Sequence, residues 1–504
     1  MGINYTVIVI VVVYLIAMLL IGWYSYTKIS SNEDFMVAGR RLGPVLMAGT
    51  LAATEIGGGS SLGVVEKAYG DWGMGASWYI ITMAITFGFL TFLGSKFRQS
   101  MVKTVPEYFR RRYGRSSGAI TSVIMIIPLI GLTATQFIAS STIISVMLGV
   151  DYKIAVILVS VVVTIYAVMG GLWSVTLTDF VQVFLIVFGM MIAIPFALKT
   201  VGGWDNVVAT LPKEKFYMVN SSINPKTIIS LIVMYLASFT VGQEAVSRYY
   251  AARDDKAAVQ GSLLAGLINI IYAFIPTVLG LITLALVTNG TIPKDIIMKD
   301  GPKYALPLLA MHTMPSVVIG LLFAGIISAT MSSADSDLLG AGSIFGNDIY
   351  KIYIKPDATS SEVMRTTKIT MLVIGFLAML VALMNKGSLI KLLTLSFTLR
   401  AAGAFFPYVM GHYWKKASAV GTVASLLLGS FITLYVEINK ITIFGLKEPI
   451  IPGLAVSFLA FFILGIITYL NIPVSLLPNI AIPEITVQVA VPNTSARELE
   501  NTVV

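Results

Sequence analysis

Long apolar stretches recur along the whole length of this sequence, and they limit what the chain can fold into. Thirteen such stretches of about 20 residues are present, which is the length that a helix needs to cross a lipid bilayer. Their centres lie near residues 15, 54, 85, 130, 162, 187, 235, 274, 325, 376, 401, 427 and 461. Hydrophobic residues form 57% of the chain and charged residues 12%, against about 25% charged residues in an ordinary soluble domain. No compact soluble domain can bury so much apolar surface, so the sequence predicts an all-α membrane protein with about 13 transmembrane helices.

The composition also excludes several classes of site. Cysteine is absent and histidine occurs only at His312 and His412, which excludes thiolate and His-rich metal sites and leaves little for a hydrolytic triad. The run Gly59-Ser-Ser-Leu-Gly63 has the form of a serine-hydrolase motif, but that motif needs a strand–turn–helix context and a histidine base. The net charge of +9 does not require a nucleic-acid partner, because basic residues in so apolar a chain are more often in cytoplasmic loops. We therefore expect neither an enzyme nor a nucleic-acid-binding protein.

The distribution of basic residues predicts an orientation. The opening run from Tyr5 to Trp23 is too long for a typical signal-peptide core and lacks a cleavage pattern, so we expect it to be retained as a helix. If the N-terminus is outside, most Lys and Arg residues of the loops face inward, most clearly in the segment 96–115. The positive-inside rule therefore favours an external N-terminus and a cytoplasmic C-terminus.

The second apolar stretch carries a carboxylate and a run of glycines. Glu55 lies near its middle and is followed by Gly57, Gly58 and Gly59. Each glycine weakens a helix by roughly 1 kcal/mol relative to alanine, so the run predicts an unwound segment. Broken helices of this kind form substrate and ion sites in secondary transporters. The alternative is close helix packing, since Gly59 and Gly63 form a GxxxG pattern.

The ninth stretch places several oxygen ligands on one helix face. Ala329, Ser332, Ser333 and Ser336 follow the i, i+3, i+4, i+7 spacing. Hydroxyl and carbonyl oxygens with little negative charge suit a monovalent hard cation such as sodium, whereas divalent cations usually recruit more carboxylates. The alternative is that these serines bond to their own helix or to neighbouring helices.

Other polar residues interrupt apolar stretches. Asp179 could cap a helix at the inner face or line an ion path. The polar residues 242–244 suggest a second broken helix, and Arg248 and Arg253 beyond them are expected to be inner-face anchors. Gln136 either forms a hydrogen bond between helices or contacts the substrate.

Three of these segments together resemble a known family. They are Ala-Thr-Glu-Ile-Gly-Gly-Gly at 53–59, Gly-Gly-Leu-Trp-Ser-Val-Thr-Leu-Thr-Asp at 170–179 and Ala-Thr-Met-Ser-Ser-Ala-Asp-Ser at 329–336. In this order they resemble the sodium:solute symporter family, over about residues 5–458. The resemblance implies thirteen helices, ten of which form two inverted five-helix repeats. Spans two and seven would lead the repeats and carry the breaks.

The resemblance also implies ligands. The first sodium would be held by the carbonyls of Ala53, Ile56 and Ala329 and the hydroxyls of Ser332 and Ser333. A possible second sodium would use Asp179, Asp335 and Ser336. Substrate contacts would come from Glu55, Ser60, Gln136, Gln243 and Glu244. An acidic residue at 55 departs from the small polar residue of some members, and it favours a cationic or zwitterionic solute or serves the ion.

The end of the chain, residues 459–504, does not fit this family. The run from Leu476 to Ile485 and the stretch from Pro492 to Glu500 resemble the start of a resistance-nodulation-division efflux pump. The last helix would then be a hybrid of the two. A tail of some thirty residues cannot bury a core of its own, so we expect it to be poorly packed.

These observations predict a multi-pass symporter of the bacterial plasma membrane. Sodium, the expected cofactor ion, would drive import of a small polar organic solute by alternating access, without an obligate protein partner. One alternative is a non-transporting sodium-linked sensor, although no signalling domain is visible. Another is a fragment of an efflux pump, which only the tail suggests.

Overall fold

The computed structural model describes residues 4–26, 31–385, 387–442 and 449–471, and all regular secondary structure in these ranges is helical. A single parallel β-bridge joins Leu42 to Ala252. The long helices are α1 (Tyr5–Tyr26), α5 (Trp78–Gln99), α7 (Arg115–Leu148), α8 (Tyr152–Met169), α9 (Leu172–Met191), α12 (Pro225–Val241), α14 (Asp255–Thr288), α17 (Ser316–Ile344), α18 (Ser360–Met384), α19 (Leu389–Tyr413), α20 (Ala419–Asn439) and α21 (Ile450–Asn471). The shorter ones are α2 (Asn32–Val37), α3 (Pro44–Glu55), α4 (Val64–Tyr69), α6 (Val105–Tyr113), α10 (Ala193–Val201), α11 (Trp204–Thr210), α13 (Gln243–Ala251), α15 (Lys294–Asp300) and α16 (Ala305–Thr313).

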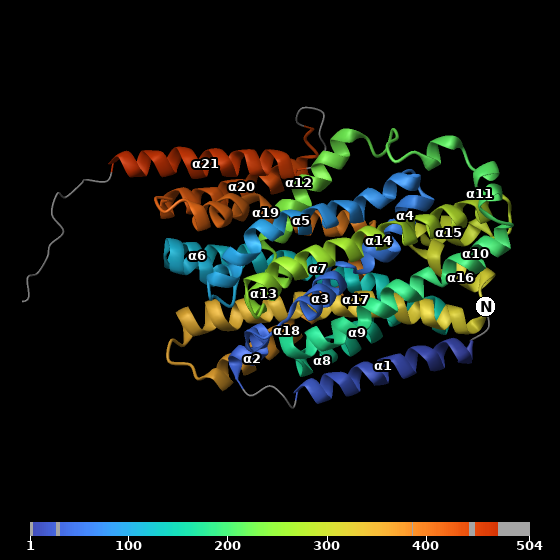
Figure 1. The fold of residues 1–504 in the computed structure, drawn as a ribbon, viewed down its shortest axis with the longest axis horizontal. Helices are drawn as coiled ribbons and strands as arrows, with labels where there is room; N and C mark the ends of the chain where they lie inside the picture. The colour runs from blue at the N-terminus through green and yellow to red at the C-terminus, as the bar shows by residue number, and fades with distance from the viewer. Residues whose placement is uncertain (1–3, 27–30, 386, 443–448, 472–504) are drawn as a thin grey trace, which may run out of the picture.

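The long helices run roughly along one axis of the molecule (Figure 1). Eleven described helices are long and apolar enough to cross a membrane, and twelve if the bent pair α12–α13 is counted as one span. The interrupted segment α3–α4 does not meet this criterion, because the 12 residues of α3 span only about 18 Å of a hydrocarbon core about 30 Å thick. The membrane-protein class is therefore supported. Each predicted centre lies in a helix, but length and composition support eleven or twelve candidate spans and do not confirm the predicted thirteen.

Polar side chains mark where several helices begin. Asp254 accepts a hydrogen bond from the Ala257 backbone N–H at 2.8 Å and caps α14. Thr359 and Glu362 form a reciprocal capping box at the start of α18. Such caps satisfy backbone N–H groups that have no partner within the helix, so these apolar helices start at defined residues.

Helix α17 forms the centre of the molecule. Of its apolar stretch, 89% is buried, against 28% for α1. It packs against α9 through two glycines, where a Cβ on Gly189 would lie 2.7 Å from the Leu321 carbonyl oxygen and one on Gly325 2.9 Å from that of Leu185. Small residues permit this close approach of backbones.

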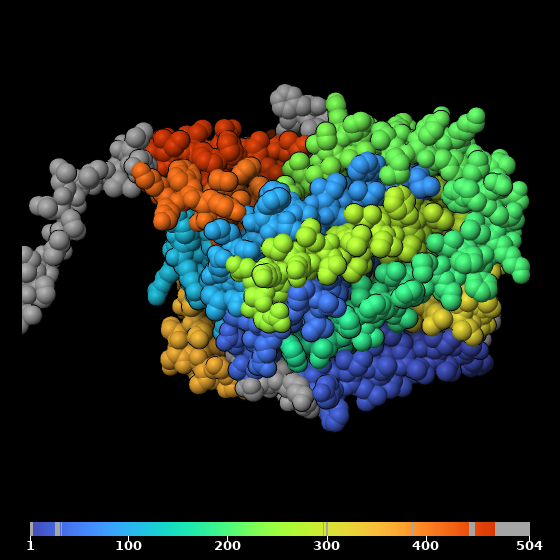
Figure 2. Space-filling view, in the orientation of Figure 1, coloured from blue at the N-terminus to red at the C-terminus, as the bar shows by residue number. Residues whose placement is uncertain are grey.

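The peripheral helices present apolar side chains outward. α1 lies along one edge of the molecule, and the mutually packed pair α20–α21 lies along the opposite edge (Figure 2). Val13, Phe188 and Phe431 are examples of large exposed apolar residues, with 60%, 57% and 61% of their surface accessible. Apolar surface of this kind suits contact with lipid.

The two ends of the described chain lie at opposite ends of the helix axis. α1 begins near α10, α11 and α16, whereas α21 ends on the side where α6 lies (Figure 1). Residues 472–504, on which the efflux-pump resemblance falls, lie outside the described residues.

Candidate functional site

The predicted break after Glu55 is present. α3 ends at Glu55, Ile56 leaves the helical conformation with φ −82° and ψ 74°, and a π-helical turn covers Gly59–Gly63. The Gly58 backbone N–H donates a hydrogen bond to Gln136 Oε1 at 2.7 Å. A Cβ on Gly57 would lie 2.6 Å from Ser333 Oγ, so glycine allows α7 and α17 to approach the break.

The packing alternative for this segment also holds. A Cβ on Gly63 would lie 2.9 Å from Ile390 of α19, so the GxxxG pattern does serve close contact. The segment therefore contains both a helix break and a close helix contact. Gly57 and Gly58 allow the break, and Gly63 allows the close contact with α19.

The second predicted break is present between α12 and α13. The two helices are bent by 52°, and Gly242 between them is extended, with φ −66° and ψ 118°. Gln243 then points to the start of α6, where its Oε1 accepts from the Val105 N–H at 2.8 Å. Glu244 points instead to the interior of the protein, where it is 4% exposed.

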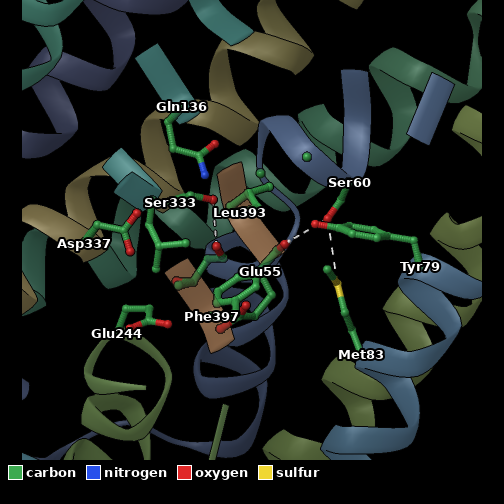
Figure 3. Close-up of a pocket in the computed structure, with 14 residues that line it drawn as sticks. Glu55, Ser60, Tyr79, Met83, Gln136, Glu244, Ser333, Asp337, Leu393 and Phe397 are labelled. Carbon is green, nitrogen blue, oxygen red and sulfur yellow. Dashed lines mark hydrogen bonds between the residues drawn. The ribbon is translucent and has the colours of Figure 1, made fainter. Parts of the chain in front are cut away.

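A buried cavity lies where the breaks meet α5, α7, α17 and α19. Its volume is about 20 Å³, which is room for about one water molecule and far below the roughly 300–1,000 Å³ of typical ligand pockets. Its walls must therefore move apart to admit a solute. Of the five candidate substrate residues, the four that line it are Glu55, Ser60, Gln136 and Glu244, and Gln243 is not among them. Figure 3 shows Glu244 and Asp337 on one side of this space and Tyr79 and Met83 on the other, with Glu55 between them.

The candidate sodium ligands of α3 and α17 lie together. Ser332 Oγ donates to the Ala53 carbonyl at 2.7 Å and to the Ala329 carbonyl at 2.9 Å. Ser333 Oγ donates to the Ala329 carbonyl at 3.1 Å and to that of Thr54 at 2.7 Å. Each serine thus bonds to its own helix, as the alternative interpretation expected, and also bridges to α3. The oxygen-only donor set fits a hard monovalent cation, and the fifth candidate, Ile56, lies at the break beside it.

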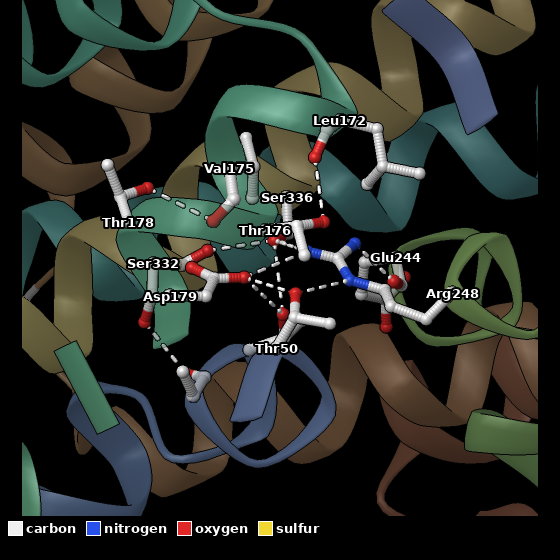
Figure 4. Close-up of polar contacts among 12 residues, drawn as sticks. Thr50, Leu172, Val175, Thr176, Thr178, Asp179, Glu244, Arg248, Ser332 and Ser336 are labelled. Atoms are coloured by element: carbon white, nitrogen blue, oxygen red, sulfur yellow. Dashed lines mark hydrogen bonds and ion pairs between the residues drawn. The ribbon is translucent and has the colours of Figure 1, made fainter. Parts of the chain in front are cut away.

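Arg248 lies between two of the residues considered for a second sodium, Asp179 and Ser336. Asp179 Oδ2 accepts from Thr50 Oγ1 at 2.5 Å and lies 3.3 Å from Arg248 Nη2 (Figure 4). The same Nη2 donates to Ser336 Oγ at 2.5 Å. Both oxygens of Asp335 are buried and have no hydrogen-bond partner within the described residues. A guanidinium, not an open oxygen cage, therefore connects Asp179 to Ser336.

The expectation that Arg248 is an inner-face anchor is wrong. Its side chain is 1% exposed and forms an ion pair with the fully buried Asp179. The bend at Gly242 brings α13 into contact with α3 and α17, so a residue near the end of an apolar stretch becomes central.

Sequence reasoning also missed Arg400 and Asp337. Arg400 contacts Glu244 through two nitrogen–oxygen pairs of 2.7 and 2.6 Å, and Asp337 lines the cavity. Both lie within apolar stretches, where a charged residue is a functional candidate by default. That signal could have identified them.

Comparisons with known proteins agree with this fold. A family model described as the sodium:solute symporter family matches residues 35–429. The chain is 27% identical over 487 residues to the osmoregulated proline transporter OpuE of Bacillus subtilis (strain 168), covering 90% of this chain and 94% of the relative. It is 28% identical over 443 residues to the high affinity choline transporter 1 of Homo sapiens, covering 85% and 76%.

A solved structure shares the architecture. A substrate-bound, outward-open Na⁺-coupled sialic acid symporter matches with a TM-score of 0.77 at 21% identity, covering 92% of this chain and 98% of that one. At this identity the likeness concerns the fold. These relatives are transporters rather than enzymes.

Proposed function

Because the chain belongs to the sodium:solute symporter family, we propose that it uses sodium entry to import a small polar organic solute by alternating access. One observation carries this proposal. The unwound end of α3 borders a small buried cavity and is tied to α17 by Ser332 and Ser333. A broken helix beside an oxygen-lined ion site is the arrangement on which secondary transporters are built.

The first sodium would bind among the oxygens of Ala53, Ile56, Ala329, Ser332 and Ser333. Because these oxygens come from two helices, sodium would hold α3 against α17 and stabilise the state that binds solute. A ligand shifts a conformational equilibrium only through its different affinity for the two states. Solute should therefore raise sodium affinity by the same factor by which sodium raises solute affinity.

Solute contacts are assigned to the cavity residues Glu55, Ser60, Gln136 and Glu244. Gln243 would support this site indirectly, through its bond to the start of α6. A second sodium at Asp179, Asp335 and Ser336 would require Arg248 to leave Asp179 and Ser336. We therefore propose that this protein transports one sodium ion with each solute molecule.

Several larger features belong to the same proposal. Residues 1–458 would form the transport domain, with thirteen crossings and two inverted five-helix repeats. The N-terminus would be outside and the C-terminus inside a bacterial plasma membrane. The α3–α4 break supports a crossing there, because non-helical backbone at membrane depth is tolerated where it lines a cavity or is buried in protein.

Transport in proteoliposomes tests the function. Purified protein would be assayed with a panel of labelled solutes under an inward sodium gradient, a potassium gradient or no gradient. We expect at least one small polar solute to accumulate only with the sodium gradient. Uptake that is equal under all three conditions for every transported solute would contradict sodium coupling.

A further inference from the structure

The central cavity contains more acidic than basic groups. Glu55, Glu244 and Asp337 line it and are 7%, 4% and 3% exposed. Arg400 neutralises Glu244 through the contacts of 2.7 and 2.6 Å. Within the described residues Glu55 and Asp337 take part in no ion pair. Two carboxyl groups of the cavity are therefore left without a cationic partner.

An ionised, unpaired carboxylate away from water is costly, so such a group either takes up a proton or binds a cation. Glu55 Oε1 is buried and has no hydrogen-bond partner in the described part of the chain, and its side chain lines the open space (Figure 3). When both free carboxyl groups are ionised, two monovalent cations compensate them. Sodium supplies one of them, because its proposed ligand Ser333 lines the same cavity.

We propose that the solute supplies the other, and that it is a small organic cation whose ammonium or amidinium group is bound by Glu55 and Asp337. This inference rests on the proposed sodium-coupled transport and narrows its substrate class. With one sodium and one such solute, the loaded cavity would carry no net charge. That balance lowers the cost of closing the cavity to water.

A zwitterionic solute fits less well, because its carboxylate would find no available cationic group among the described residues of the site. Arg400 holds Glu244 and also donates from Nε to Ser238 Oγ at 2.7 Å. Arg248 donates to Ser336 and, at 2.6 Å, to the Glu244 carbonyl. The Gly58 N–H at the break is already bound to Gln136.

The apolar wall of the cavity is also suited to a cation. Tyr79, Phe397 and Met83 line it, and aromatic ring faces attract ammonium and guanidinium groups. The guanidinium carbon of Arg400 already lies over the Phe397 ring, 4.9 Å from the ring centroid. Aromatic faces and carboxylates together favour an organic cation over a bare inorganic ion.

The test compares solutes that differ mainly in charge. Choline, ethanolamine and methylguanidine would represent cations, 3,3-dimethylbutanol the uncharged isostere of choline, and glycine betaine and proline the zwitterions. Binding would be followed by thermal stabilisation of the purified protein in sodium, and transport by sodium-driven uptake. We expect at least one cation to act at a concentration at least tenfold lower than the zwitterions and the isostere.

Two size-conserving variants assign the effect to the carboxylates. Glu55→Gln and Asp337→Asn should each weaken the response to the cation at least tenfold, while sodium alone still stabilises the protein. Glu66→Gln is the matched control, because Glu66 lies on the same broken segment and is 7% exposed but is not among the residues lining the cavity. It should leave the response to the cation unchanged.

The outcomes separate the solute class from the function. Sodium-driven uptake of a zwitterion or an uncharged solute, with no response to any cation, would overturn the cation inference and leave symport intact. Cation uptake that ignores sodium would support the solute class and contradict the coupling. A response to the cation that survives both Glu55→Gln and Asp337→Asn would remove the carboxylates from the site.

Discussion

Arg248 and Asp179 form an ion pair that is withdrawn from solvent, with side-chain exposures of 1% and 0%. Taking two charges out of water is repaid only when geometry and further hydrogen bonds are good. Arg248 meets that condition, because its guanidinium also reaches Thr50 at 3.2 Å and the Glu244 carbonyl at 2.6 Å. One side chain thereby ties α13 to α3, α9 and α17.

Removing one partner of this pair should be more harmful than removing both. Arg248→Met leaves Asp179 buried and uncompensated, which typically costs about 3–5 kcal/mol, whereas the double variant with Asp179→Asn should recover much of that loss. Thermal and denaturant unfolding in detergent measure it. The control Arg253→Met breaks an exposed pair, with exposures of 63% and 45%, and exposed pairs contribute about 0–1 kcal/mol. Equal losses for Arg248→Met and the double variant would contradict this account.

The serine pair of α17 gives a second prediction at this scale. Ser332→Ala with Ser333→Ala removes two of the proposed sodium oxygens, so apparent sodium affinity should fall at least tenfold, or by about 1.4 kcal/mol. Solute affinity should recover in part at saturating sodium. A sodium titration of thermal stability and of uptake measures both quantities, and an unchanged titration in a folded variant would reject the site.

At the scale of elements, two short interruptions create the cavity. Both positions could be predicted from the sequence, because consecutive glycines after Glu55 and polar residues at 242–244 contradict the apolar pattern around them. The direction in which α13 continues could not be predicted from the sequence, because the bend of 52° between α12 and α13 depends on the helices against which α13 packs. For the same reason the burial of Arg248, the orientation of Gln243 toward α6 and the ion pair of Arg248 with Asp179 emerge only from tertiary packing.

A methyl group at the first break tests how closely the elements must meet. Gly57→Ala would place a Cβ 2.6 Å from Ser333 Oγ, so the serine must move from the Thr54 carbonyl that it contacts. We expect a several-fold loss of sodium affinity with the fold retained, measured by the same titration. Gly88→Ala on α5 is the control, since nothing lies within 4 Å of its added Cβ. Alanine there should be neutral or stabilise α5 by up to about 1 kcal/mol.

At the scale of the whole molecule, apolar length alone predicted the membrane class and the position of each long helix. It did not establish the number of crossings, because a broken span such as α3–α4 lacks a continuous helix of sufficient length. The last described helix, α21, packs on α19 and α20, where the Trp414 ring stacks on that of Phe462 with centroids 5.3 Å apart. Within the described residues, this ring contact attaches α21 at Phe462.

The tail should therefore be dispensable. Truncation after Leu470 should leave sodium-driven uptake within about twofold of the full chain, because a segment of some thirty residues cannot build a core of its own. Truncation after Pro449, which also removes α21 and its contact with Trp414, should impair the protein. Uptake in proteoliposomes at matched protein content compares the three. A large loss in the shorter truncation, despite normal insertion, would show that the tail contributes to transport.

The glycine contact between α9 and α17 has a consequence for which parts of the protein can move. Where backbones meet at Gly189 and Gly325 with no room for a side chain, the two helices should travel as one rigid body. Asp179 on α9 and the serines Ser332 and Ser333 on α17 then keep a constant distance throughout the transport cycle. The backbone carbonyls at the end of α3 move toward these serines and away from them. Spin labels on α9 and α17 should report the same distance with and without sodium. The distance between spin labels on α3 and α17 should change when sodium is added. The residence time of sodium is then set by how often the short helix α3 moves away from the rigid pair α9–α17.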